Sequence, residues 1–271
     1  ICPVGALTNT QFRFKARTWD LSNSETLCAH CGCNCNMTLG SRTNKLMRIE
    51  TRPNDLVDDG WICDKARFGY GFIESDNRLI EATNLIGSEK KIVKTLDAAA
   101  LAVESLKKII DEHGPESVGF IGSAFGTNEE LYLYHKLFRL KLGTNNLDHK
   151  TYLDTPGLPV DHYDFLNIET ANLILLIGSD PVEELPILDL RIKKAVTRKG
   201  VKLAILNDQK TELDKFADLS LRYDVGADGT ALAVLANGLA GELGISSIDD
   251  DAINPSATGI NEEQMKSMVE L

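Results

Sequence analysis

Five of the six cysteines of this chain lie in one short window, and this clustering constrains the fold more than any other feature. Cys28, Cys31 and Cys35 follow the spacing C-x2-C-x3-C, and Cys63 is a remote fourth cysteine. Thiolates at such spacing suit a soft, thiophilic metal, because each sulfur donates charge that a hard, oxygen-seeking cation would not use well. We therefore expect a metal centre held by these four cysteines.

The spacing favours an iron-sulfur cluster over zinc. Zinc sites built from four cysteines commonly contain two C-x2-C knuckles, whereas a loop of three cysteines with a distant fourth is typical of a [4Fe-4S] cluster. Zinc stays open as the alternative, because four thiolates in tetrahedral geometry suit both metals. Cys33 is interpreted as a thiol packed nearby or as a substitute for Cys31 or Cys35.

The first residues lead us to expect that the chain is a piece of a longer protein. It starts without methionine, and Cys2-Pro3 resembles the closing ligand of a ferredoxin-type cluster whose other ligands would lie upstream. We therefore interpret Cys2 as a free thiol here.

Composition excludes several classes of function. The 271 residues are enough for one large domain or two ordinary ones, and 43% hydrophobic residues are typical of a globular protein. A net charge of -11 without a basic stripe argues against a nucleic-acid partner. No apolar run approaches the roughly 20 residues of a membrane helix, so we expect no direct membrane insertion, and the N-terminus shows no signal pattern. Crowded cysteines in such a chain indicate a reducing compartment and metal ligation instead of disulfides.

A small β-rich domain is predicted around the cysteines. Residues 37–39 and 46–49 alternate in polarity and flank the polar turn 41–45, which predicts a β-hairpin. The turn at residues 58–60 then returns Cys63 beside the first three cysteines. So short a segment has little apolar core, and we expect its metal to nucleate it.

Strands and helices alternate in the rest of the chain. The expected helices cover residues 96–112, 127–142, 185–199, 230–243 and 261–271, and the expected strands residues 117–121, 172–178, 201–206 and 217–221. This order predicts an α/β fold, with a Rossmann-like three-layer αβα domain that follows the small β-rich domain. The expected domain boundaries are residues 1–73 for the iron-sulfur domain, 74–94 for a linker and 95–271 for the Rossmann-like domain.

Several motifs resemble a known family. They are the cysteine run with its remote Cys63-Asp64-Lys65, the Arg-Phe-Gly-Tyr run at residues 67–70, and the stretch ending in Asp-His at residues 143–149. These motifs are similar to those of molybdopterin oxidoreductases of the formate dehydrogenase type. The whole chain is still more similar to their relative, the large iron-sulfur subunit of bacterial NADH-quinone oxidoreductase (respiratory complex I).

This resemblance implies ligands and a cofactor. Cys28, Cys31, Cys35 and Cys63 match the ligands of an additional [4Fe-4S] cluster found in some bacterial versions of that large subunit, so one such cluster is the expected cofactor. In the molybdenum enzymes, a lysine just after the fourth cysteine lies between cluster and pterin and assists electron passage. Lys65 matches it and is an electron-relay candidate; the alternative is a cation that balances cluster charge or a solvated side chain.

The predicted sheet has a candidate cofactor edge. Loops that follow its strands would lie where α/β folds bind ligands. The candidate cofactor-binding residues are Gly122, Gly178, Ser179, Asp180 and Asp208. The resemblance implies that such loops hold two pterin guanine dinucleotides in molybdenum members. The alternative is that short turns need glycine for their geometry alone, and no GxGxxG motif is present.

The position that would bind molybdenum differs from that of the family. Relatives of the formate dehydrogenase type follow Asp-His with an arginine and then a cysteine or selenocysteine, whereas Tyr152 and Asp154 occupy those places here. Residues 207–210 also lack the Asp-Pro-Arg run of pterin-binding members. We therefore expect a degenerate domain without molybdopterin guanine dinucleotide, and interpret His149 and His162 as structural or surface residues.

The leading hypothesis is a piece of the large iron-sulfur subunit of complex I that transfers electrons through its [4Fe-4S] cluster and is not catalytic on its own. Its expected partners are the other subunits of the peripheral arm, and its expected location is the cytoplasm, as part of that membrane-bound complex. The alternatives are a molybdenum-dependent formate dehydrogenase alpha subunit and a zinc-stabilised interaction module.

Overall fold

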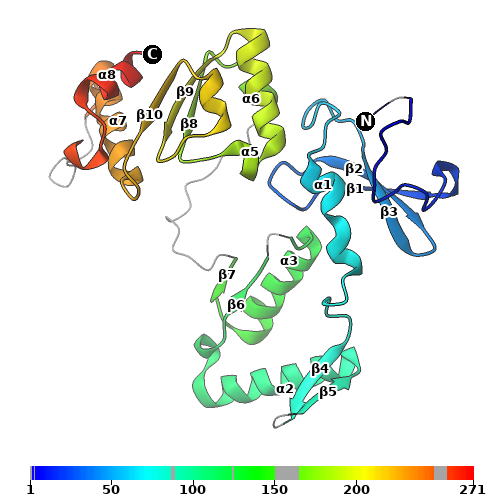
Figure 1. Ribbon diagram of the computed structural model, residues 1–271. Helices are drawn as coiled ribbons and strands as arrows, with labels where there is room; N and C mark the ends of the chain where they lie inside the picture. Colours follow the sequence, from blue (N-terminus) through cyan, green and yellow to red (C-terminus); the bar gives the residue numbers. More distant parts are fainter. Residues whose placement is uncertain (1, 3, 87–88, 124, 150–164, 247–254) are drawn as a thin grey trace. The chain divides into compact units, whose positions relative to one another are not determined.

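The computed structural model describes residues 2, 4–86, 89–123, 125–149, 165–246 and 255–271 (Figure 1). They belong to two compact units. The first unit is Ile1–Gly69 together with His162–Leu271, and the second unit is Tyr70–Asp161. None of the described helices is long and apolar enough to cross a lipid bilayer.

A small antiparallel sheet begins the first unit, after the 3-10 turn η1 (Thr18–Asp20). Its strands β1 (Ser22–Leu27), β2 (Asn36–Arg42) and β3 (Lys45–Thr51) pair in the order β1-β2-β3. The β2–β3 connection is confirmed as a hairpin, and its turn residues Thr43 and Asn44 both have positive φ, 49° and 59°. Strand β1 is not predicted from the sequence, because its polar residues carry no apolar alternation.

The second unit begins with a hairpin and two short parallel strands. Helix α1 (Asp64–Phe68) and the 3-10 helix η2 (Gly69–Glu74) lead into β4 (Ala82–Ile86) and β5 (Glu89–Val93), which pair as an antiparallel hairpin inside the segment expected to be a linker. The elements that follow are α2 (Thr95–His113), η3 (Pro115–Ser117), β6 (Phe120–Ile121), α3 (Asn128–Lys136), the π-helical η4 (Leu137–Leu142) and β7 (Leu147–Asp148). Thr127 caps α3 through the predicted capping box, and β6 pairs with β7 in parallel.

A parallel sheet forms the rest of the first unit. Strands β8 (Leu173–Ile177), β9 (Lys202–Asn207) and β10 (Leu219–Arg222) pair in the order β10-β9-β8. The helical elements around them are α4 (Phe165–Ile168), α5 (Pro181–Glu184), α6 (Pro186–Lys199), η5 (Glu212–Phe216), α7 (Asp228–Leu243), η6 (Pro255–Thr258) and α8 (Glu262–Glu270).

The side chains of β9 alternate between two apolar cores, one on each face of the sheet. Leu203 and Ile205 pack with Ile192 of α6 on one face. Ala204 and Leu206 belong to the core on the other face, which α7 and α8 cover (Figure 1). A strand that is apolar on both faces needs a helical layer on each side. The α/β fold class is therefore confirmed, with a β-rich start followed by a helix–sheet–helix sandwich.

Candidate metal centre

The loop between β1 and β2 carries four of the cysteines. Cys28 directly follows β1 and Cys35 directly precedes β2, and the backbone N–H of Cys28 donates to the carbonyl of Cys35 at 2.8 Å. Inside the loop, Asn34 adopts a positive φ of 48° and its N–H donates to the Cys31 carbonyl at 3.3 Å. Antiparallel pairing of the two strands therefore closes the cysteine loop at its base.

Cys63 reaches the same region from a later segment of the chain. It is the N-cap residue of α1, and this short helix packs against β3. The charges of Cys31 and Cys63 both act to raise the pKa of Cys28, so each of these thiols lies within electrostatic reach of Cys28. The fold thus brings the remote cysteine to the cysteine loop.

A buried carboxylate, Asp58, ties the two ligand segments together. One of its oxygens accepts from the N–H groups of Asn54 at 3.0 Å and Gly60 at 2.9 Å, and the other from the N–H of Asn36 at 3.0 Å. Residues 54–60, called the 54–60 loop below, lead directly to Cys63, while Asn36 follows the cysteine loop. Asp58 is only 1% exposed. Its hydrogen bonds therefore fix the 54–60 loop, which leads to Cys63, against Asn36, the residue that follows the cysteine loop.

The role of Asp58 in joining the two segments is not evident from the sequence, although a turn signal is present there. The run Asp58-Asp59-Gly60 is typical of a turn whose first aspartate accepts hydrogen bonds from the backbone, and in the structure Asp59 and Gly60 have positive φ, 52° and 80°. That pattern indicates a turn. It does not show that the carboxylate also reaches Asn36 across 22 residues.

Burial raises the pKa of the thiols of Cys28, Cys33 and Cys35, because a thiolate loses its hydration inside the protein. The pKa of Cys28 lies above its ordinary value, that of Cys33 is raised to about 11 and that of Cys35 to about 12. For Cys35, the charges of Cys33, Cys28 and Asp58 add to the effect of burial. A metal cation would reverse this balance, since it binds thiolates and releases their protons.

The donor set fits a thiophilic metal. All six cysteines are free thiols, and the four expected ligands are sulfur donors from two segments that Asp58 joins. Within the described residues, no group of three or more Cys, His, Asp or Glu side chains is already arranged to hold a metal ion. The residues fit a four-thiolate centre because all four expected ligands are sulfur donors, and because pairing of β1 with β2 closes the loop that carries three of them.

Cys33 lies on the inner side of the cysteine loop. It is 2% exposed, and its pKa is affected by the neighbouring thiol of Cys31 and by the backbone of Ile187 and Leu188 at the start of α6. The structure therefore supplies packing contacts for this thiol, as one interpretation expects. Cys2 is partly exposed.

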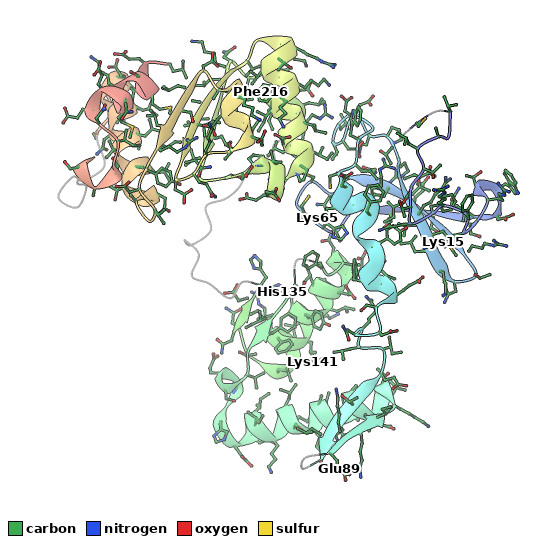
Figure 2. All side chains as sticks on the ribbon, viewed as in Figure 1. Lys15, Lys65, Glu89, His135, Lys141 and Phe216 are labelled. Carbon is green, nitrogen blue, oxygen red and sulfur yellow. The ribbon has the colours of Figure 1, made fainter. Side chains whose placement is uncertain are left out.

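Lys65 lies on the first turn of α1, beside the expected ligands (Figure 2). Its ammonium group is 3.5 Å from the carbonyl oxygen of Glu183, and its positive charge opposes the rise in the pKa of Cys28. This position suits a cation that offsets the charge of a cluster. The electron-relay role of Lys65 stays a prediction.

Four of the five candidate cofactor residues gather at the carboxyl ends of β8 and β9. Gly178 has a positive φ of 56°, and Ser179 donates to Glu184 at 2.8 Å. Asp180 caps α5 by accepting from the N–H of Val182 at 3.2 Å. Asp208 follows Asn207, whose side-chain amide donates to the Ser179 carbonyl at 3.0 Å. The side chains of Ser179 and Asp180 are therefore engaged in hydrogen bonds at this edge of the sheet.

The remaining candidates lie elsewhere. Gly122 belongs to the second unit, where its N–H donates to the Asp148 carbonyl at 2.7 Å. The N–H of His149 donates to the Asp148 carboxylate at 2.6 Å. Tyr152, Asp154 and His162 lie outside the described residues.

Two family models match this chain. The molybdopterin oxidoreductase family matches residues 96–264, and the molybdopterin oxidoreductase Fe4S4 domain matches residues 22–75. The latter range includes the four expected ligands and Asp58.

Curated relatives cover nearly all of the chain. It is 28% identical to the NADPH-Fe(3+) oxidoreductase subunit alpha of Geobacter sulfurreducens, over 100% of this chain and 35% of that protein. It is 30% identical to the NADH-quinone oxidoreductase G 2 subunit of Rhizobium meliloti, over 88% of this chain and 28% of that protein. The chain thus spans about a third of the length of these relatives.

Among solved structures, the acetylene hydratase from Pelobacter acetylenicus is similar, with a TM-score of 0.67 and 18% sequence identity. The match covers 90% of this chain and 38% of that one. At this identity the likeness shows the fold.

Proposed function

Since this chain belongs to the molybdopterin oxidoreductase family and includes its Fe4S4 domain, we propose that it carries electrons through one [4Fe-4S] cluster, as the large iron-sulfur subunit of an NADH:quinone oxidoreductase. The observation that carries the proposal is the closed cysteine loop, tied by Asp58 to the segment that ends at Cys63. The two curated relatives support it, because both are by name subunits of oxidoreductases.

Cys28, Cys31, Cys35 and Cys63 would hold the cluster. When bound, a [4Fe-4S] cluster supplies a centre that accepts and releases one electron at a time. The chain keeps water away from the sulfur atoms by burying Cys28 and Cys35, and burial of this kind tunes the reduction potential of a cluster. Lys65 adds a positive charge beside it.

The Rossmann-like domain would act as a scaffold without molybdopterin. Tyr152 and Asp154 replace the arginine and thiolate of the formate dehydrogenase type, and the polar groups of Ser179 and Asp180 are already bonded within the sheet edge. The protein would work with other subunits of the peripheral arm, on the cytoplasmic side of the membrane, and would not complete a reaction by itself.

Metal analysis tests this proposal. The intact protein, purified without oxygen, is expected to hold about four irons and about four sulfides per chain, with no molybdenum. Cys28→Ser and Cys63→Ser should each lower the iron content, whereas Lys266→Met, in an exposed ion pair on α8, should leave it unchanged. Stoichiometric molybdenum would instead support a formate dehydrogenase alpha subunit, and one zinc without sulfide would support a zinc-stabilised module.

A further inference from the structure

A buried arginine on α6, Arg191, forms hydrogen bonds with the backbone of the 54–60 loop. Arg191 is 2% exposed, and its Nε donates to the Val57 carbonyl at 3.2 Å. One terminal nitrogen donates to the Asp55 carbonyl, and the other pairs with the carboxylate of Glu169. Two of the three guanidinium nitrogens therefore join the sandwich to the segment that leads to Cys63, and the third is held by Glu169.

Glu169 keeps this arginine in place. The carboxylate is 3% exposed and also lies 3.2 Å from the ammonium of Lys194 and 2.8 Å from that of Lys199. Burial opposes its ionisation, but the hydrogen bonds from Lys199, Arg191 and Lys194 outweigh burial and lower the pKa of Glu169 to about 2. The network thus stays charged at neutral pH.

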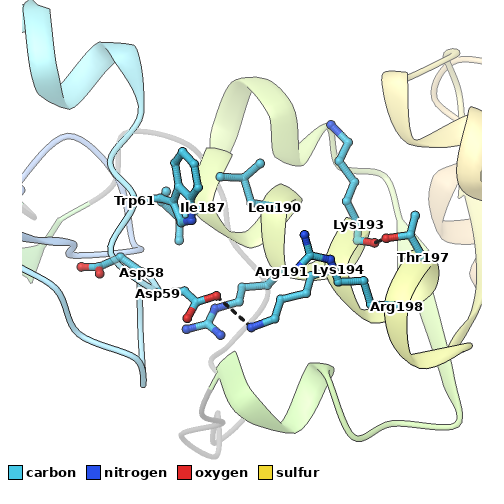
Figure 3. A pocket seen from close by; sticks show the side chains of 10 residues that line it. All are labelled: Asp58, Asp59, Trp61, Ile187, Leu190, Arg191, Lys193, Lys194, Thr197 and Arg198. Carbon is cyan, nitrogen blue, oxygen red and sulfur yellow. Dashed lines mark hydrogen bonds and ion pairs between the residues drawn. The ribbon is translucent and has the colours of Figure 1, made fainter. Parts of the chain in front are cut away.

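A second ionic contact reaches the same loop. Lys194 lies 2.8 Å from the carboxylate of Asp59, and both side chains line a surface pocket between α6 and the 54–60 loop (Figure 3). Apolar contact is only partial at this surface, because Ile187 is buried but Trp61 remains 64% exposed and Leu190 44% exposed. The attachment of the loop therefore depends on polar bonds, which need defined geometry.

The start of α6 contacts the other ligand segment. Leu185 lies 3.7 Å from the place where a side chain on Gly32 would begin, and the sulfur of Cys33 faces the backbone of Ile187 and Leu188. One helix thus contacts the cysteine loop near its first turn and the 54–60 loop further along. Its rigidity relates the two segments to each other.

We propose that Arg191 and Glu169 are positioning residues for the metal centre, and that α6 sets the position of Cys63 relative to the cysteine loop. The proposal rests on the proposed function. Without Arg191, the 54–60 loop loses two backbone contacts to α6, and a loop with few buried side chains opens easily. Mutation of groups that orient metal ligands without binding the metal themselves commonly lowers metal affinity by about 10- to 100-fold.

The test compares iron release from the intact protein, purified without oxygen. Arg191→Lys keeps the positive charge beside Glu169 but cannot serve both carbonyls of the loop. The double variant Arg191→Met with Glu169→Gln removes both charges together, so that no buried charge is left alone. Lys266→Met is the matched control, because Lys266 lies 3.6 Å from Glu270 in an exposed ion pair on α8.

We expect Arg191→Lys and the double variant to release iron to a ferrous chelator about 10-fold faster than the wild type, and Lys266→Met to release it at the wild-type rate. The electron paramagnetic resonance spectrum of the reduced cluster should shift in the first two proteins only. Unchanged iron release and spectra, with iron bound in every protein, would overturn this inference alone. A wild-type protein without iron would overturn the proposed function as well.

Discussion

Single carboxylates decide how the ligand segments meet. Asp58 accepts from three backbone N–H groups and so joins the 54–60 loop to β2. Glu169 neutralises the buried Arg191, which holds that loop from outside. Hydrogen bonds to a charged group contribute roughly 1.5–3 kcal/mol each, so the three that Asp58 accepts can fix the 54–60 loop firmly against β2.

The pH dependence of Glu169 follows from its ion pairs. Its pKa is about 2 in the folded protein, against 4.5 for an ordinary glutamate. A lowered folded-state pKa stabilises the protein above the unfolded pKa, and this stabilisation is lost as the pH falls from 4.5 towards 2. The full contribution is on the order of 3 kcal/mol.

Urea unfolding of the wild type and of Glu169→Gln between neutral pH and pH 3 checks this expectation. The difference in their free energy of unfolding should be largest at neutral pH and shrink steadily below pH 4.5. Iron is removed from both proteins beforehand, so that acid loss of the metal does not contribute to the difference. Glu270→Gln, in an exposed pair, should change the free energy by less than about 1 kcal/mol throughout. A difference for Glu169→Gln that does not vary with pH would contradict the assignment.

At the scale of elements, local chemistry explains most boundaries. Thr127 and Glu130 start α3 with a capping box, and Gly200, at a φ of 71°, ends α6. The tight turn between β2 and β3 is less well matched to its residues. Both turn positions have positive φ, which Asn44 adopts readily and the β-branched Thr43 adopts only with strain.

Thr43→Asn should therefore stabilise the hairpin. Asparagine adopts positive φ more readily than threonine, so the free energy of unfolding should rise by about 0.5–1 kcal/mol. The lost hydrogen bond from the Thr43 hydroxyl to the Arg42 carbonyl is exposed and should matter little.

Denaturant titration measures the free energy of unfolding of the wild type and of Thr43→Asn, with Thr43→Val as the control. Valine keeps the shape and the branched Cβ of threonine but lacks the hydroxyl, so it should bring no gain. Equal stability of the asparagine and valine variants would show that backbone strain at Thr43 is unimportant.

For the whole molecule, the division into two units predicts which parts of the chain lose stability when the metal is removed. The ligand segments and α6 belong to the first unit, whereas α2 and α3 belong to the second. A metal that joins distant segments stabilises the folded state by its binding free energy. Its removal should therefore loosen the first unit selectively.

Amide hydrogen exchange, measured before and after anaerobic chelation of the metal, tests whether the first unit is loosened selectively. Amides of residues 28–35, of the 54–60 loop and of the first turns of α6 should exchange at least about 10-fold faster after chelation, which corresponds to about 1.4 kcal/mol of local opening. Amides of α2 and α3 should keep their rates. Cys63→Ser should already exchange rapidly and change little on chelation. Equal acceleration in both units would contradict the division.

The family, the fold class and most elements of this protein could be predicted from the sequence alone. The resemblance to molybdopterin oxidoreductases is confirmed by the two family matches. Alternating polarity predicts the β2–β3 hairpin, and apolar runs between helices predict the parallel sheet, because such patterns depend on residues close together in the chain. Cysteine spacing names the expected ligands for the same reason.

The contacts that hold those ligands in place became visible only in the folded chain. Asp58 reaches Asn36 across 22 residues, and Arg191 reaches Val57 and Asp55 across 134 and 136 residues. In the sequence, a lone aspartate or arginine is expected to be a surface charge, because burial and hydrogen-bond partners are properties of the packed fold. The polar contacts that join α6 to the metal centre exist only once the sandwich and the small sheet have formed.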